Sequence, residues 1–270
     1  MDALHQKKAA LEAALIDLGS VAVAFSGGVD STFLLKAAHS ALGDRAVAVT
    51  AQAASVPERE LREAQAFCKD AGIRQILVDV DQLAIAGFAE NPPDRCYICK
   101  RALFSELIRT AKEHGFPYVA EGTNTDDTGD YRPGLRAIAE LQVKSPLLEA
   151  GLSKAEIRAL SKEMGLPTWD KPSLACLATR FAYGDTITKE KLSRVEKAEE
   201  KLLELGFRQV RVRVQGQTAR IETDPAEFGR LLQPAAAALV NRELQALGFQ
   251  YVSLDLGGYK TGNMNKTLEK

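Results

Sequence analysis

The sequence predicts an α/β protein with an open, doubly wound parallel sheet, followed by a smaller C-terminal α+β domain. Short, continuously apolar segments such as residues 21–25 alternate with helical segments, as strands buried on both faces of a parallel sheet do. Beyond residue 188 this rhythm gives way to a charged helix and a pair of alternating strands. We therefore expect two domains, residues 1–180 and 181–270.

The first domain opens with a helix over residues 1–19, and strands and helices then alternate. Strands are expected at 21–25, 46–51, 75–80 and 118–121, and helices at 32–42, from about 57, at 97–114 and after Ser153. Capping boxes are predicted for two of the helices, formed by Ser55 with Glu58 and by Ser153 with Glu156. Parallel strands need such crossover helices between them.

A proline-containing segment with little periodicity, residues 165–188, connects the two parts. The second domain is expected to contain a helix at 189–205, strands at 209–214 and 219–222, two further helical stretches and a strand at 251–254. This order of elements is typical of a small α+β domain.

The composition narrows the possible partners. With 46% hydrophobic residues, 26% charged residues and a net charge of −1, the chain lacks the excess of positive charge expected of a nucleic-acid-binding protein. The sequence shows neither a secretory signal nor an apolar stretch long enough to span a membrane. We expect a cytoplasmic protein that has no membrane partner.

The strongest local motif is the string SGGVDS at residues 26–31, where the first strand turns into a helix. Gly27 and Gly28 allow the backbone to approach an anion, and the free amides of the helix N-terminus add donors. Ser26 and Ser31 add hydroxyl donors. Asp30 would repel a bare phosphate, so it predicts a bound Mg²⁺. The alternative is a glycine-rich turn without a ligand, and the string is neither a Walker A motif nor a dinucleotide fingerprint.

A second polar segment, residues 121–134, follows the predicted strand at 118–121. Ligands of open α/β sheets bind at the carboxyl ends of the strands. We expect Thr123 and Asn124 to contact the nucleotide, Asp127 to help hold Mg²⁺ and Arg132 to bind a phosphate or carboxylate. A solvated loop rich in turns is the alternative.

Three of the four cysteines are placed for chemistry. Cys96 and Cys99 form a C-x-x-C pair before a helix, and Cys176 lies in the connecting segment. Three thiolates are one ligand short of a structural zinc site. They can instead hold a [4Fe-4S] cluster with one iron open for an exogenous ligand such as sulfide. Cys68 falls within a charged helical pattern and is expected to be a packing residue.

Two other interpretations of the cysteines remain open. Cys176 can act alone as a nucleophile or sulfur donor, with Lys171 and Arg180 nearby in the sequence to favour its thiolate. All of the cysteines can also be small buried hydrophobic residues.

The SGGVDS string resembles the phosphate loop of the N-type ATP pyrophosphatases, or PP-loop enzymes, over about residues 18–180. This resemblance implies that ATP is cleaved between its α- and β-phosphates to give an adenylated substrate, while the loop holds pyrophosphate. Further strings resemble the LarE family of sulfur transferases over nearly the whole chain, namely EGTNTDDTGDYRPG, KSPLLEAGLSKAEIR, DKPSLACLATRF and GGYKTGNMN.

The LarE resemblance implies a substrate and a reaction. The substrate would be pyridinium-3,5-dicarboxylic acid mononucleotide, whose carboxylate is adenylated and then converted to a thiocarboxylate for a nickel-pincer cofactor. Some members of the family sacrifice a cysteine sulfur, and others use three cysteines and an iron–sulfur cluster to deliver sulfide. The set of Cys96, Cys99 and Cys176 resembles the second type. The family also implies a homo-oligomer.

The alternating stretch at residues 210–214 places Arg211 and Arg213 on one face of the second domain and three valines on the other. Neighbouring guanidinium groups suit phosphate recognition, and the family uses arginines in a similar stretch for this purpose. An exposed strand face is the alternative. Glu200, on the adjacent helix, is a weaker candidate for the same site, and Lys260 is expected to be solvated.

Three other functions share some of these features. A tRNA thiolase would share the loop and the cysteines but need a basic RNA-binding face. For an ammonia-using synthetase the cysteines would be incidental. A non-enzymatic module would bind ATP without releasing pyrophosphate.

Overall fold

The computed structural model describes residues 2–129, 133–173, 175–260 and 262–264. The chain divides into two compact units, one made of Met1–Ile85 with Cys96–Leu174 and the other of Ala86–Arg95 with Ala175–Lys270. The second unit therefore includes a short segment from the first half of the chain, which no pattern in the sequence indicated.

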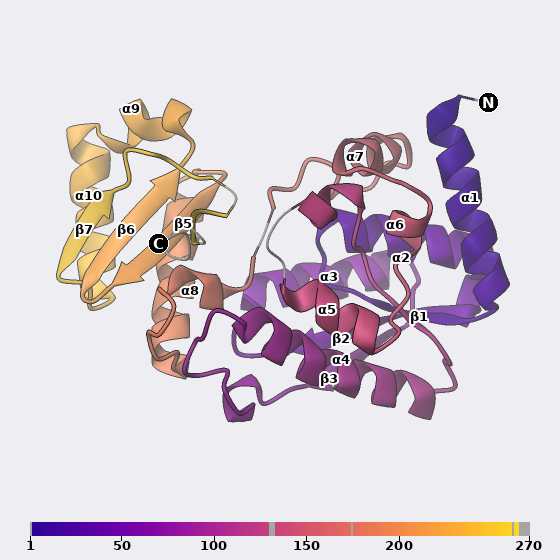
Figure 1. The fold of residues 1–270 in the computed structure, drawn as a ribbon. Coiled ribbons are helices and arrows are strands. Elements are labelled where there is room, and N and C mark those ends of the chain that lie inside the picture. The colour runs from indigo at the N-terminus through magenta and orange to yellow at the C-terminus, as the bar shows by residue number, and fades with distance from the viewer. Residues whose placement is uncertain (1, 130–132, 174, 261, 265–270) are drawn as a thin grey trace. The chain divides into compact units, whose positions relative to one another are not determined.

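The first unit contains a parallel sheet of four strands, β1 (Val21–Ala24), β2 (Ala46–Gln52), β3 (Gln75–Asp79) and β4 (Val119–Ala120), in the order β3-β2-β1-β4 (Figure 1). The chain runs outward from β1 in one direction and returns to pair β4 with its other side. The order of the strands thus reverses beside β1, and ligands of doubly wound sheets bind at such a point.

Helices cover both faces of this sheet. Val21 and Val23 of β1 pack into one core cluster, with residues of α1 (Ala3–Leu18), α2 (Val29–Leu42), α3 (Glu58–Asp70), α6 (Pro146–Glu149) and α7 (Lys154–Glu163). Ala22 points to the opposite face, into a cluster with α4 (Arg95–Glu113) and α5 (Pro133–Glu140). The predicted doubly wound α/β fold is confirmed.

The two predicted capping boxes have different outcomes. Ser153 and Glu156 form the reciprocal bonds of a capping box at the start of α7, as expected. The box predicted for Ser55 and Glu58 is wrong. Pro57 is the N-cap of α3, so Glu58 occupies the first helical position rather than the third, and Ser55 uses its backbone N–H to bond Gln82.

The second unit contains a three-stranded sheet, β5 (Val210–Gln215), β6 (Thr218–Thr223) and β7 (Tyr251–Leu254), in that order. The β5–β6 pair is antiparallel and the β6–β7 pair is parallel. Helix α8 (Lys189–Glu204) packs against β5, and α10 (Pro234–Ala246), preceded by α9 (Phe228–Leu231), packs against β7. The expected α+β composition is confirmed.

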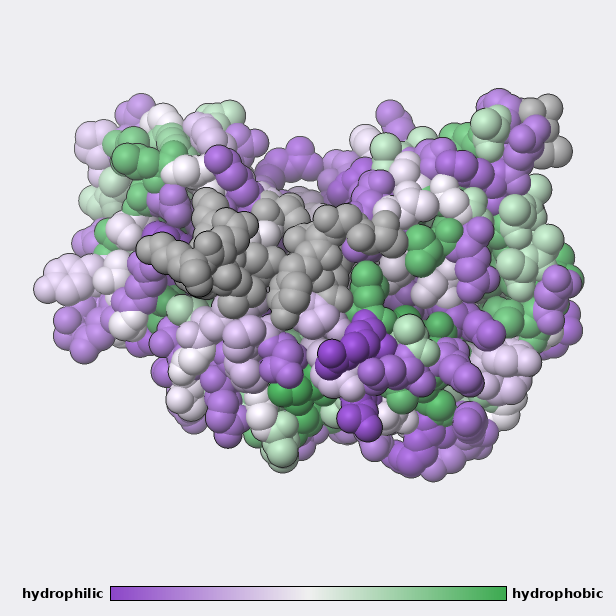
Figure 2. Space-filling view, in the orientation of Figure 1, coloured by the Kyte–Doolittle hydropathy of each residue, from purple (hydrophilic) through white to green (hydrophobic). Residues whose placement is uncertain are grey.

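The face in Figure 2 is mostly hydrophilic, with hydrophobic residues in small separate patches. Among the described residues no helix is both long and apolar enough to cross a membrane.

Candidate functional site

The SGGVDS loop joins β1 to α2. Gly27 has a φ of 73°, a conformation that favours glycine, and Gly28 is the N-cap of α2 without a side-chain cap. The Ser31 hydroxyl lies 3.2 Å from that of Ser26 and donates to the Gly28 carbonyl at 3.1 Å. The serines therefore hold the loop in shape, and the N-cap Gly28 has no side chain to occupy the first amides of α2. Such a helix N-terminus is suited to bind phosphate.

Asp30 lies in the first turn of α2 and is largely buried. Its Oδ2 accepts a bond from the ammonium group of Lys154, whereas its Oδ1 is buried with no hydrogen-bond partner among the described residues. Burial raises the pKa of Asp30, Lys154 opposes this, and the nearby Asp127 carboxylate reinforces it. A carboxylate oxygen without a partner, close to a second carboxylate, fits a hard cation such as Mg²⁺.

Lys154 belongs to none of the predicted sites, although it lies directly after the predicted N-cap Ser153. The helix dipole disfavours a lysine in the first turn of a helix. The unfavourable position of Lys154 is therefore the one feature of the sequence that could have indicated a special role for it. In the structure the Lys154 ammonium group donates a hydrogen bond to the Asp30 carboxylate, and its charge acts to lower the pKa of that carboxyl.

The polar segment after β4 lies against the phosphate loop. A Cβ on Gly122 would be 3.1 Å from both the Asp30 Cβ and the Ser31 backbone nitrogen, so a larger residue here would have to push the phosphate loop away by a few tenths of an ångström. The buried Thr123 donates to the carboxylate of Glu121, and the buried Asn124 receives a backbone bond from Asp126. These bonds hold the segment at the carboxyl end of the sheet.

The other residues predicted in this segment have separate outcomes. Asp127 is half-buried and accepts the backbone N–H of Asn124 at 3.1 Å. Arg132 lies outside the described residues. The roles expected for Thr123, Asn124, Asp127 and Arg132 in binding ATP and Mg²⁺ remain predictions.

Cys96 and Cys99 lie three residues apart near the start of α4, on one face of the helix. Both are half-buried, and the buried Gln82 donates its amide to the Cys99 sulfur at 3.0 Å. Both cysteines belong to the first unit, whereas Cys176, also half-buried, belongs to the second. Within the described part of the chain, no group of three or more His, Cys, Asp or Glu side chains is arranged to hold a metal ion.

The loop that carries Cys176 is anchored within the second unit by two arginines. Arg95 donates to the Ala178 carbonyl at 2.9 Å, and Arg180 donates to the carbonyls of Ala175 and Cys176 at 2.8 and 3.1 Å. Arg95 directly precedes Cys96 in the chain. No pattern in the sequence indicates this role of Arg95, because a lone arginine before a predicted helix forms no recognisable motif.

The expected packing role of Cys68 is confirmed, since its side chain lies in the core and burial raises the pKa of its thiol to about 12. At pH 8 only about one Cys68 thiol in ten thousand should then be ionised. We expect iodoacetamide to leave Cys68 of the native, iron-free protein unmodified while it labels the three half-buried cysteines. Peptide mass spectrometry checks this, with protein in guanidinium as the control. Labelling of native Cys68 at the rate of Cys176 would contradict it.

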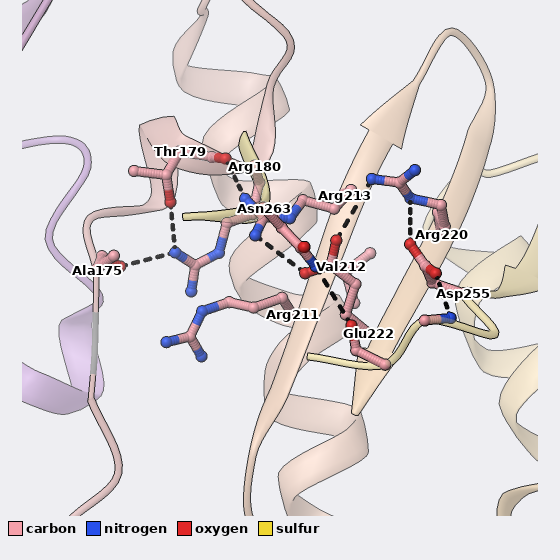
Figure 3. Close-up of polar contacts among 12 residues, drawn as sticks. Ala175, Thr179, Arg180, Arg211, Val212, Arg213, Arg220, Glu222, Asp255 and Asn263 are labelled. Atoms are coloured by element: carbon pink, nitrogen blue, oxygen red, sulfur yellow. Dashed lines mark hydrogen bonds and ion pairs between the residues drawn. The ribbon is translucent and has the colours of Figure 1, made fainter. Parts of the chain in front are cut away.

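The arginines of β5 are buried, so the alternative of an exposed strand face is wrong. Arg211 is 3% and Arg213 is 9% exposed, because the loop after Cys176 covers this face and its Thr179 carbonyl accepts a bond from Arg213 at 2.5 Å. Arg213 also pairs at 3.0 Å with the fully buried Glu222 across the β5–β6 pair, and Glu222 also bonds Arg220 of its own strand (Figure 3). The valines of β5 are buried on the other face, as the alternation predicted.

Glu199, rather than the predicted Glu200, is the carboxylate that reaches this cluster. It accepts bonds from Nε and one terminal nitrogen of Arg180, both at 2.8 Å, and from the backbone N–H of Val212. Glu200 is half-buried. The buried stripe of α8, which consists of Leu192, Val195, Ala198, Glu199 and Leu202, would have identified position 199 by its helical period.

The charges in this cluster influence each other strongly. Burial lowers the pKa of Arg180, but Glu199 outweighs burial and leaves that pKa above its ordinary value. Burial, together with the nearby Arg180 guanidinium, lowers the pKa of Arg211 to about 10. A cavity of about 160 Å³ in the same unit is lined by Arg180, Arg213 and Arg220, with Asp255 at its wall. Such a cluster of guanidinium groups is suited to an anionic ligand.

Comparison with known proteins agrees with this geometry. The profile of the family described as "Queuosine biosynthesis protein QueC" matches residues 20–91, which include the phosphate loop. An uncharacterized protein of Synechocystis is 44% identical over 254 residues, covering 94% of this chain and 95% of that protein.

A pyridinium-3,5-bisthiocarboxylic acid mononucleotide synthase of Lactiplantibacillus plantarum is 42% identical over 271 residues, covering 100% of this chain and 98% of that protein. The chain belongs to the family of this synthase, the LarE family. It is accordingly an ATP-dependent sulfurtransferase with a PP-loop domain. A tRNA-specific 2-thiouridylase MnmA of Rhizobium rhizogenes is more distant, at 29% identity over 63% of this chain and 54% of that protein.

Proposed function

We propose that this LarE-family protein adenylates a carboxylate of pyridinium-3,5-dicarboxylic acid mononucleotide and replaces the AMP with sulfur. The product would be a thiocarboxylate for a nickel-pincer cofactor. The observation that carries this proposal is the full-length similarity to a synthase whose name specifies the bisthiocarboxylic acid mononucleotide. We assign ATP binding to residues 1–180 and substrate-phosphate binding to residues 181–270.

In the first step the substrate carboxylate attacks the α-phosphorus of ATP, and pyrophosphate leaves. The loop of Ser26, Gly27, Gly28 and Ser31 would bind the departing phosphates with the amides of α2. Asp30, together with Asp127, would hold Mg²⁺ through its Oδ1, which has no hydrogen-bond partner among the described residues. Thr123 and Asn124 would border the nucleotide, and Arg132 would contribute a further positive charge.

The substrate phosphate would bind at Arg211 and Arg213 in the second unit, beside the Glu199 carboxylate. Support comes from the burial of both guanidinium groups and from the adjacent cavity. A buried guanidinium group binds a phosphate more strongly than an exposed one does, because less water competes for its N–H donors.

For the sulfur step we propose that Cys96, Cys99 and Cys176 hold a [4Fe-4S] cluster. When bound, the cluster would supply an open iron that can carry sulfide. Two of the thiols share one face of α4, and the residue before Cys96 bonds the Cys176 loop within the second unit. Sulfide adds to the acyl carbon of the adenylate, and AMP leaves with the bonding electrons. The alternative is that Cys176 provides the sulfur and becomes dehydroalanine.

The decisive experiment incubates the purified protein with the mononucleotide, ATP, Mg²⁺ and sulfide. We expect AMP and pyrophosphate to form only with the mononucleotide, and the thiocarboxylate to appear by mass spectrometry. AMP formation stimulated by unmodified tRNA instead would favour a tRNA thiolase. Full turnover with ammonia by a Cys96→Ala variant would favour an ammonia-using synthetase.

Iron and acid-labile sulfide content of anaerobically purified protein tests the source of sulfur. A cluster predicts about four irons per chain, lost in each of the variants Cys96→Ala, Cys99→Ala and Cys176→Ala but retained in Cys68→Ala. Protein without iron that loses ~34 Da at Cys176 after one turnover would instead show that this cysteine is consumed. Light scattering of the same samples tests the expected homo-oligomer.

A further inference from the structure

Lys171 makes three polar contacts that the reaction described above does not use. Its ammonium group donates to the Gly27 carbonyl at 3.1 Å, to Glu60 at 2.6 Å and to Glu63 at 2.8 Å. The side chain is 13% exposed, and all four residues belong to the first unit. The segment that leads toward Cys176 is thus bonded directly to the phosphate loop.

The backbone of this segment is fixed independently of the lysine head group. Arg158 of α7 donates from one terminal nitrogen to the Trp169 carbonyl and from the other to the Lys171 carbonyl, each at 2.7 Å. Glu60 and Glu63 of α3 then hold the ammonium group from another side. Both the backbone and the ammonium group of Lys171 are therefore fixed when it bonds Gly27. Ordering this long side chain costs conformational entropy, which the bonds to Glu60 and Glu63 offset.

The bond to Gly27 determines which way the next amide points. The peptide bonds of the described chain are trans, so the C=O and N–H of one peptide unit point in opposite directions. With its carbonyl held by Lys171, the peptide between Gly27 and Gly28 directs the Gly28 N–H away from Lys171. Peptides between two glycines rotate more freely than others, so an external bond has more influence on this one.

We propose that Lys171 is a positioning residue for the phosphate loop, which aims the Gly28 amide at the phosphates beyond the α-phosphate of ATP. It should therefore strengthen binding of ATP and pyrophosphate but not of AMP, which lacks those phosphates. The proposal depends on ATP binding at this loop and is independent of the sulfur chemistry.

The test compares the dissociation constants of ATP and AMP, measured by calorimetry with Mg²⁺, for wild type and Lys171→Met. We expect about 10-fold weaker binding of ATP, the usual effect of one charge-assisted hydrogen bond, and unchanged binding of AMP. Lys171→Arg should recover part of the loss. Lys162→Met is the matched control, because Lys162 lies 4.7 Å over the Trp169 ring in the same region and, within the described part of the chain, makes no hydrogen bond to the loop.

Removing Lys171 leaves Glu60 buried beside Glu63, which can destabilise the protein by itself. The double variant Lys171→Met with Glu60→Gln removes this charge, and we expect it to show the same selective loss for ATP. Equal losses for ATP and AMP in the double variant, or no loss, would overturn the proposal. A wild type that binds ATP but makes no AMP with the mononucleotide would overturn the proposed substrate alone.

Discussion

Asp30→Asn is expected to lower the rate of AMP and pyrophosphate formation by a factor of about 10² to 10³, the usual cost of losing one electrostatic contact to a reacting phosphate group. The substitution keeps the size of the side chain but removes the charge that we assign to Mg²⁺. The buried Oδ1 has no hydrogen-bond partner among the described residues, so we expect the substitution to affect the protein mainly when Mg²⁺ is bound.

The dependence on magnesium distinguishes this role from a structural one. We expect Asp30→Asn to need a higher Mg²⁺ concentration for half-maximal rate, measured by release of pyrophosphate, while the melting temperature changes little. Asp17→Asn, on the exposed side of α1, is the matched control and should behave as wild type. An unchanged magnesium requirement in Asp30→Asn would exclude the assigned role.

Arg180→Met is expected to reduce the free energy of unfolding by about 3–5 kcal/mol, because it leaves the buried Glu199 carboxylate without its counter-charge. It should also slow thiocarboxylate formation, since the carbonyls of Ala175 and Cys176 lose a donor. Urea unfolding and mass spectrometry of the product measure the two effects separately. Lys201→Met, which breaks an exposed ion pair with Glu204, should change neither.

A double variant separates positioning from stability. Arg180→Met with Glu199→Gln removes both charges and keeps an acceptor for the backbone N–H of Val212. We expect it to recover most of the lost stability, because a neutral pair avoids the buried charge. Thiocarboxylate formation should stay slow, since the Cys176 loop still lacks its donor. Recovery of activity together with stability would show that Arg180 has only a structural role.

Local patterns were sufficient where neighbours in the sequence are also neighbours in space. The phosphate loop is one such case, because its glycines, serines and Asp30 act within a single turn between a strand and a helix. The capping box of Ser153 is another, since both partners lie within one helical turn. The box predicted for Ser55 does not form because α3 begins two residues later than expected, with Pro57 rather than Ser55 as its N-cap.

Contacts between distant segments could not be predicted. The pairing of Asp30 with Lys154 spans 124 residues, and that of Lys171 with Glu60 spans 111. A charged residue on a helix has no preferred partner in sequence, because the partner depends on how the helices pack. The period of α8 would have placed Glu199 on the buried face, yet only the structure shows that this carboxylate holds Arg180.

The sequence by itself determined the doubly wound sheet, the phosphate loop and the LarE-family resemblance, because each depends on short-range periodicity or on contiguous motifs. Only the tertiary structure decided that Arg211 and Arg213 are buried and that residues 86–95 belong to the second unit. Burial on both faces of a strand depends on what covers each face. A distant segment supplies that cover, and its position is set by packing rather than by local pattern.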